Sequence, residues 1–84
     1  MTETKEQIFE ELCRLIEPLN LKGLTIVPST DIATDLAIDS VAVMDFVMEI
    51  EDLFDIDIPL NLLSESRTMD DLVKIVEQRL GEGA

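Results

Sequence analysis

The chain has 84 residues, with 19 acidic and 6 basic side chains, no histidine and a net charge of −13. This length suits one small domain with a single core, and the lack of histidine excludes Ser-His and Cys-His catalysis within the chain, so no enzyme acting alone is expected. No apolar run approaches the length of a membrane span and the first residues lack a signal-peptide pattern, so we expect a cytoplasmic protein. We also expect the chain to be a monomer.

The acidic residues are concentrated in the middle of the chain. No Lys or Arg lies between Lys22 and Arg67, a stretch that contains ten acids. A field of one sign repels phosphate backbones and attracts basic protein surfaces. Without Trp or Tyr for base stacking, nucleic-acid binding is not expected. The simpler alternative is that the acids only keep the protein soluble.

The first predicted element is an amphipathic helix over about residues 4–17. Thr4 and Gln7 fit a capping box at its start, and Pro18 is expected to end it. Its apolar stripe contains Ile8, Leu12, Leu15 and Leu19, flanked by Phe9 and Ile16. Cys13, the only cysteine, lies in this apolar pattern and is interpreted as a partly buried filler, not as a nucleophile.

A connection without clear periodicity follows, over about residues 18–39. Connections of this length are uncommon in compact domains unless they are functional or held in place. Residues 31–36 are predicted to form a short helical turn, and the long connection is expected to let the first two long helices run in a similar direction. The apolar anchors of the connection are expected to be Leu24, Ile26, Val27, Ile32, Leu36 and Ile38.

The second long helix is predicted over residues 40–54, a stretch without Gly or Pro. Asp39 and Ser40 are residue types that cap helices. At 100° per residue, one side of this helix forms a core stripe of Val43, Phe46, Val47, Ile50 and Phe54. Val41, Met44 and Met48 fall nearly opposite, among acids. This second apolar strip is interpreted as a contact surface, with packing of both methionines on the next helix as the alternative.

An extended exit with Ile58 directed inward leads to Pro59, which is expected to open a short helix over about residues 60–65. Thr68 is expected to cap the last helix, with Gly81 as its stop. The apolar stripe of that helix contains Met69, Leu72, Val73, Val76 and Leu80. Together these elements predict an all-α fold, a small bundle of three long helices and a short third one. We expect residues 1–84 to form a single domain with an ordered core of about residues 4–80.

The motif Asp39-Ser40-Val41, preceded by Leu36 and followed by an acidic helix that ends in Glu51-Asp52-Leu53-Phe54, resembles the acyl carrier proteins. The resemblance covers roughly residues 32–80. In that family the serine of an Asp-Ser-Leu motif carries a 4′-phosphopantetheine arm derived from coenzyme A, and Ser40 occupies the matching position. From the residues alone, Asp39 and Ser40 would be interpreted simply as a helix cap.

The resemblance implies a carrier, not an enzyme, that holds acyl groups as thioesters on an arm at Ser40. Asp39 would belong to the motif and cap the helix. The implied partners are a phosphopantetheinyl transferase and acyl-transferring and condensing enzymes with basic docking patches, in fatty-acid, lipid or polyketide-type synthesis. Family contacts concentrate on this helix, where the matching face contains Val41, Met44, Asp45, Met48, Glu51 and Asp52.

The sequence departs from the housekeeping fatty-acid carriers at several positions. Val41 replaces the leucine of the motif, Ala42 replaces an acid, and the segment from Pro59 to Leu63 is apolar where those carriers are acidic. We therefore predict a specialised stand-alone bacterial carrier. The alternatives are a peptidyl or aminoacyl carrier and an unmodified acidic module that binds a basic partner. A metal site is not expected, because Asp31, Asp35 and Asp39 lack EF-hand spacing.

Overall fold

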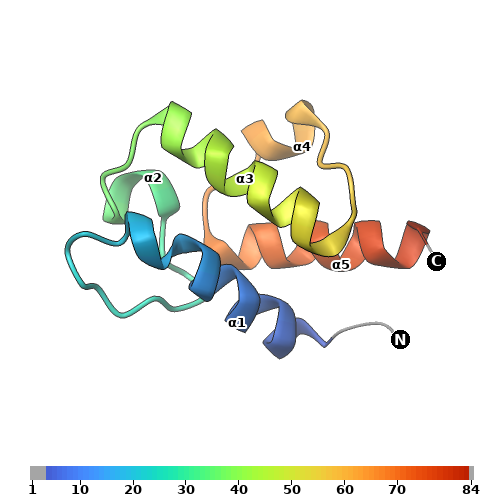
Figure 1. Ribbon diagram of the computed structural model, residues 1–84, viewed down its shortest axis with the longest axis horizontal. Coiled ribbons are helices and arrows are strands. Elements are labelled where there is room, and N and C mark those ends of the chain that lie inside the picture. Colours follow the sequence, from blue (N-terminus) through green and yellow to red (C-terminus); the bar gives the residue numbers. More distant parts are fainter. Residues whose placement is uncertain (1–3, 84) are drawn as a thin grey trace.

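The computed structural model describes residues 4–83, and these residues form helices joined by loops (Figure 1). The three long helices are α1 (Lys5–Ile16), α3 (Ser40–Phe54) and α5 (Met69–Gly83). Two short helices, α2 (Ile32–Asp35) and α4 (Leu60–Ser64), precede α3 and α5 respectively, and a 3₁₀ turn (Glu17–Leu19) follows α1. In the described part of the chain the only β pairing is an isolated bridge between Asp31 and Thr68. The predicted all-α bundle is confirmed, with the helical turn at residues 31–36 as α2.

Helix α1 begins with the predicted capping box. The Thr4 hydroxyl accepts a hydrogen bond from the Gln7 amide (3.2 Å), and the Gln7 side chain accepts one from the Thr4 amide (2.9 Å). The α-helix ends at Ile16, one residue earlier than predicted, because Pro18 lies in the 3₁₀ turn that follows. Ile16 is fully buried with Ile8 and Leu12, whereas Leu15 is only partly buried.

The relative direction of the long helices differs from the prediction. Figure 1 shows that α3 and α5 run the same way and that α1 runs opposite to both. The connection between α1 and α3 is long because it first crosses to the start of α5. There, Met69 donates a backbone hydrogen bond to Thr30 (3.1 Å) and Asp70 donates one to Pro28 (2.8 Å). The parallel pair is instead α3 and α5, because the segment that contains α4 returns the chain between them.

The connection is anchored by fewer apolar side chains than predicted. Ile32 and Leu36 are buried, and Ile26 and Ile38 pack partly against the core. Leu24 and Val27 are exposed, so their prediction as anchors is wrong. Hydrogen bonds hold this part of the connection in place instead. For example, the hydroxyl of the buried Thr30 accepts a hydrogen bond from the Val27 amide (2.8 Å).

The predicted core stripes of α3 and α5 are buried. Phe46, Val47 and Ile50 of α3 are almost inaccessible, and Val43 and Phe54 pack against them. In α5 the buried residues are Met69, Leu72, Val73, Ile75 and Val76, of which Ile75 was not predicted. The Thr68 hydroxyl caps α5 by accepting from the Asp71 amide (3.2 Å).

Helix α5 continues to Gly83, so the prediction that Gly81 stops it is wrong. A glycine stop requires the left-handed backbone conformation, and Gly23 is the glycine that adopts it in the described chain. The core as a whole therefore lies between α1, α3 and α5. It leaves the start of α3 and one side of that helix at the surface.

Candidate functional site

Ser40 is the first residue of α3 and its side chain is exposed. The residue before it, Asp39, is the N-cap: its backbone is extended and its carboxylate accepts a hydrogen bond from the Ala42 amide (2.9 Å). This cap uses the carboxylate of Asp39, while Ser40 is exposed at the surface. Asp39 therefore caps the helix, and Ser40 is left accessible at the surface.

Two features place Ser40 at this corner. Leu36 is buried at the end of α2 and fixes the chain to the core. Ala37 then adopts a left-handed conformation (φ 53°), which turns the chain toward Asp39. Left-handed backbone is unfavourable for alanine by roughly 1–2 kcal/mol, so packing around Leu36 holds a strained turn directly before the motif. The sequence pattern did not indicate this turn.

The start of α3 favours a negatively charged group. The first amides of a helix have no partner within it. The Asp39 carboxylate accepts from the Ala42 amide, and the Asp39 carbonyl accepts from the Val43 amide (3.0 Å). The amides of Ser40 and Val41 remain available, and the positive end of the helix dipole lies beside them. A phosphodiester on the Ser40 hydroxyl would fit these donors, although the carboxylate of Asp39 opposes it.

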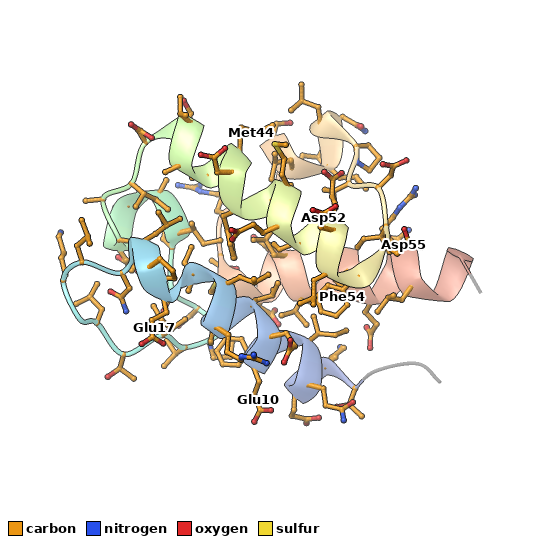
Figure 2. The ribbon with its side chains drawn as sticks, in the orientation of Figure 1. Glu10, Glu17, Met44, Asp52, Phe54 and Asp55 are labelled. Atoms are coloured by element: carbon orange, nitrogen blue, oxygen red, sulfur yellow. The ribbon has the colours of Figure 1, made fainter. Side chains whose placement is uncertain are left out.

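The outward strip of α3 is exposed as predicted. Val41 is 69%, Met44 40% and Met48 59% exposed. Figure 2 shows Phe54 directed toward α5 and Met44 on the opposite side of α3. Both methionines are therefore exposed at the surface, as the interpretation of a contact surface requires.

A shallow acidic groove lies along the second half of α3 and the chain that follows it. It brings together four residues of the predicted docking face, Asp45, Met48, Glu51 and Asp52. The groove also contains residues that the sequence analysis did not assign to the site, namely Glu49, Asp55, Ile56 and Asp57. Val41 and Met44 do not line the groove and lie nearer to Ser40 along α3. Leu53 and Leu60 are also exposed, at 49% and 69%, but Leu53 lies about 180° from Met44 around α3 and is therefore not part of the outward strip.

Glu51 differs from the other predicted docking residues. Its Oε2 accepts a hydrogen bond from the Ile58 amide (2.8 Å), and its side chain is partly buried. The bond holds the exit loop after Asp55, whose left-handed backbone (φ 54°) ends α3. Glu51 therefore shapes the groove and is less available to a partner than Asp45 or Asp52.

A half-open cavity of about 260 Å³ lies beside the start of α3. Val43, one turn after Ser40, forms part of its wall, so the cavity lies on the adjoining surface of α3. Ile32, Leu63 and Leu72 provide apolar walls from α2, α4 and α5. The rest of the lining is Asp31, Ala33, Thr34, Ser66 and Arg67.

Two titratable side chains outside the motif have shifted pKa values. Hydrogen bonds from the amides of Arg67 (3.0 Å) and Thr68 (3.2 Å) lower the pKa of Asp71, which keeps it ionised at the start of α5. Burial, together with nearby Glu10, raises the pKa of the Cys13 thiol. A thiol with a raised pKa is a poor nucleophile, in agreement with its interpretation as a filler.

Within residues 4–83 no group of three or more His, Cys, Asp or Glu side chains is arranged to hold a metal ion. No helix of this part of the chain is long and apolar enough to cross a membrane.

Comparison with known proteins gives consistent matches. The family described as "Phosphopantetheine attachment site" matches residues 7–76. A "Probable acyl carrier protein" of Caulobacter vibrioides is 51% identical over 45 residues, which is 54% of this chain and 52% of that protein. An "Acyl carrier protein" of Prochlorococcus marinus is 29% identical over 93% of this chain and 99% of its own length. One of Picosynechococcus is 29% identical over 90% of this chain and 95% of its own length.

Proposed function

Since the chain belongs to the acyl carrier protein family, whose members have a phosphopantetheine attachment site, we propose that Ser40 is the residue to which the arm is attached. The observation that carries this proposal is the exposure of Ser40 at the first position of α3, directly after the Asp39 cap. The other serines of the chain, Ser29, Ser64 and Ser66, do not open a long helix. They therefore lack the set of amide donors that suits a phosphodiester.

The residues at the start of α3 fit the group. Ser40 would hold it through its Oγ, and the amides of Ser40 and Val41 would face the phosphodiester. When bound, the arm supplies a thiol on which acyl groups are held as thioesters. The protein itself presents and protects this cargo, and carriers of this family are not enzymes.

We propose that partner enzymes dock on the outward side of α3. Val41, Met44 and Met48 would contact apolar side chains of the partner, because flexible methionines adapt to several surfaces. Asp45 and Asp52 would attract basic patches of a phosphopantetheinyl transferase and of acyl-transferring or condensing enzymes. Glu51 would act indirectly, by holding the groove in shape through its bond to Ile58.

The pathway we propose is a specialised one of fatty-acid, lipid or polyketide type. Its support is the apolar segment from Pro59 to Leu63, in which Leu60 is 69% exposed. We also propose that the chain forms one domain and acts in the cytoplasm. We propose a monomer because a net charge of −13 keeps copies of the chain apart.

Modification by coenzyme A tests the assignment of Ser40. Incubation of the apo protein with coenzyme A and a broad-specificity phosphopantetheinyl transferase should add one arm, detected as a single increase in intact mass. Ser40→Ala should abolish the increase, whereas Ser29→Ala, a change at another exposed serine, should not affect it. If the Ser40→Ala variant still gains the mass of the arm, the attachment site is another residue. No modification by several transferases would favour the unmodified interaction module.

A further inference from the structure

We infer that Arg79, a residue of α5, is a positioning residue for the acidic groove on which basic partners dock. The inference rests on the docking surface proposed above and names a residue outside that surface on which docking depends. Arg79 does not belong to the lining of the groove. It acts on the groove through one peptide group, the one that joins Asp57 to Ile58.

This peptide group is hydrogen bonded to a charged side chain on each side. Its N–H donates to Glu51 Oε2 of α3 (2.8 Å), and its carbonyl accepts from Arg79 Nε of α5 (2.9 Å). Hydrogen bonds to charged groups are stronger than neutral ones, and bonds in a chain polarise one another. Both side chains are half-buried, which limits competition from water. An acid of one helix and a base of another therefore hold the same peptide, and we call this arrangement the peptide clamp.

The segment that the peptide clamp holds has no regular structure. Residues 56–59 belong to no helix or strand. The Ile58 side chain is 7% exposed and anchors the segment in the core. Apolar burial is non-directional, so it fixes how deep the segment lies but not how the neighbouring peptide is rotated. Hydrogen bonds are directional, so the peptide clamp fixes that rotation and with it the direction in which the Asp57 side chain leaves the backbone.

The position of this segment decides the shape of the acidic groove. Part of the lining comes from α3, whose regular backbone fixes it, and Asp55, Ile56 and Asp57 come from the segment. The segment lies beside the second half of α5, from which Arg79 reaches it (Figure 1). A basic patch on a partner must meet the carboxylates of both parts at once. The fit of the two surfaces therefore depends on the peptide clamp.

The positive charge of Arg79 acts on docking in the opposite direction. The chain has a net charge of −13, and loss of one base would make it more negative. On electrostatic grounds alone this loss would strengthen the attraction of a basic partner. Loss of the peptide clamp would instead weaken docking, because the segment would no longer be held in place. The two effects differ in sign, so a docking experiment can separate them.

Two substitutions separate the donor of Arg79 from its charge. In glutamine Nε2 is attached to Cδ, as Nε is in arginine, so Arg79→Gln keeps a donor at the same place along the side chain. Arg79→Met is of similar length and has no donor. Both variants lose the same positive charge and the outer guanidinium nitrogens. Lys74→Met is the control, because it removes the same charge from an exposed side chain of the same helix.

The apo variants are compared as substrates of a phosphopantetheinyl transferase whose docking patch is basic, with coenzyme A in excess. Circular dichroism first verifies that each variant is folded. Arg79→Met should raise the KM for the carrier about fivefold, which corresponds to a loss of about 1 kcal/mol of docking free energy, with little change in kcat. Arg79→Gln should keep the KM near that of the wild type. Lys74→Met should leave the KM unchanged or lower it.

Hydrogen exchange gives a readout that does not depend on the transferase. In Arg79→Met the Ile58 amide should exchange faster than in Arg79→Gln, while the amide of Ile50 within α3 keeps its protection. Arg79→Ala, which also lacks the donor, gives a second comparison with Arg79→Gln.

Three results would overturn the inference. They are equal KM values for Arg79→Met and Arg79→Gln, the same rise in KM for Lys74→Met, and unchanged exchange of the Ile58 amide in Arg79→Met. If the wild type gains no arm, which its intact mass shows, the proposed attachment fails and the inference fails with it. If the wild type is modified and only the Arg79 variants behave otherwise than expected, the attachment stands and the inference alone is wrong.

Discussion

The two sides of α3 have the same backbone and opposite surroundings. On the inner side Phe46, Val47 and Ile50 are at most 2% exposed, and on the outer side Val41 and Met48 are 69% and 59% exposed. All five are apolar, so hydrophobicity alone does not separate them. Their position around the helix does, because a period of 3.6 residues brings every third or fourth side chain to the same side. Stability and recognition should therefore respond to different substitutions in this one helix.

The largest effect on stability should come from the inner side. Ile50 is fully buried, and Ile50→Ala should lower the free energy of unfolding by about 2–5 kcal/mol, through lost burial and the cavity left behind. Val47→Ala should act in the same direction with a smaller loss. Urea unfolding followed by circular dichroism measures both. A loss below about 1 kcal/mol for Ile50→Ala would mean that Ile50 does not lie on the side of α3 that packs into the core.

Glu51 should contribute to stability although it lies on the outer side of α3. It lines the acidic groove and also accepts a hydrogen bond from the Ile58 amide. Glu51→Ala should lower the free energy of unfolding by about 1.5–3 kcal/mol, the usual range for a hydrogen bond to a charged group. Asp52→Ala is the matched control, since Asp52 is exposed and carries the same charge. Its effect should stay within about 0.5 kcal/mol. Equal effects in urea unfolding would show that the bond to Ile58 contributes nothing to stability.

The smallest effects on stability should come from the outer strip. Met44→Ala and Met48→Ala should each change the free energy of unfolding by less than about 1 kcal/mol, as surface substitutions usually do. Both should instead slow modification of Ser40 by the transferase, because they remove apolar contacts from the proposed docking surface. Initial rates at limiting carrier concentration measure this. Losses of stability as large as that of Ile50→Ala would place the methionines in the core and move the docking surface.

The sequence predicted the local features of this fold well. Caps at Thr4, Asp39 and Thr68 and the helical spacing of apolar residues act within a few residues of each other, and each is visible in the printed order of side chains. The division of α3 into two sides is of this kind. So is the place of Ser40 as the first residue of the helix predicted over residues 40–54.

Features that depend on distant residues were missed or predicted wrongly. The opposite direction of α1 and α3 follows from hydrogen bonds between the long connection and the start of α5, such as that from Asp70 to Pro28. The exposure of Leu24 and the bond from Ile58 to Glu51 also depend on where other segments lie. The continuation of α5 past Gly81 shows a further limit, because glycine permits a stop without requiring one.

The hydrogen bonds that join the long connection to the start of α5 also bear on the order in which the molecule assembles. They pair residues 28–32 with residues 67–70, so α2 gains its place only after a large loop of chain has closed, which is entropically costly and slow. The turns of α3, by contrast, close over four residues. We therefore expect α2, and with it one wall of the cavity, to fold last and to open first in native-state hydrogen exchange. A carrier built in this way can expose its cavity by a local opening while α1, α3 and α5 remain folded.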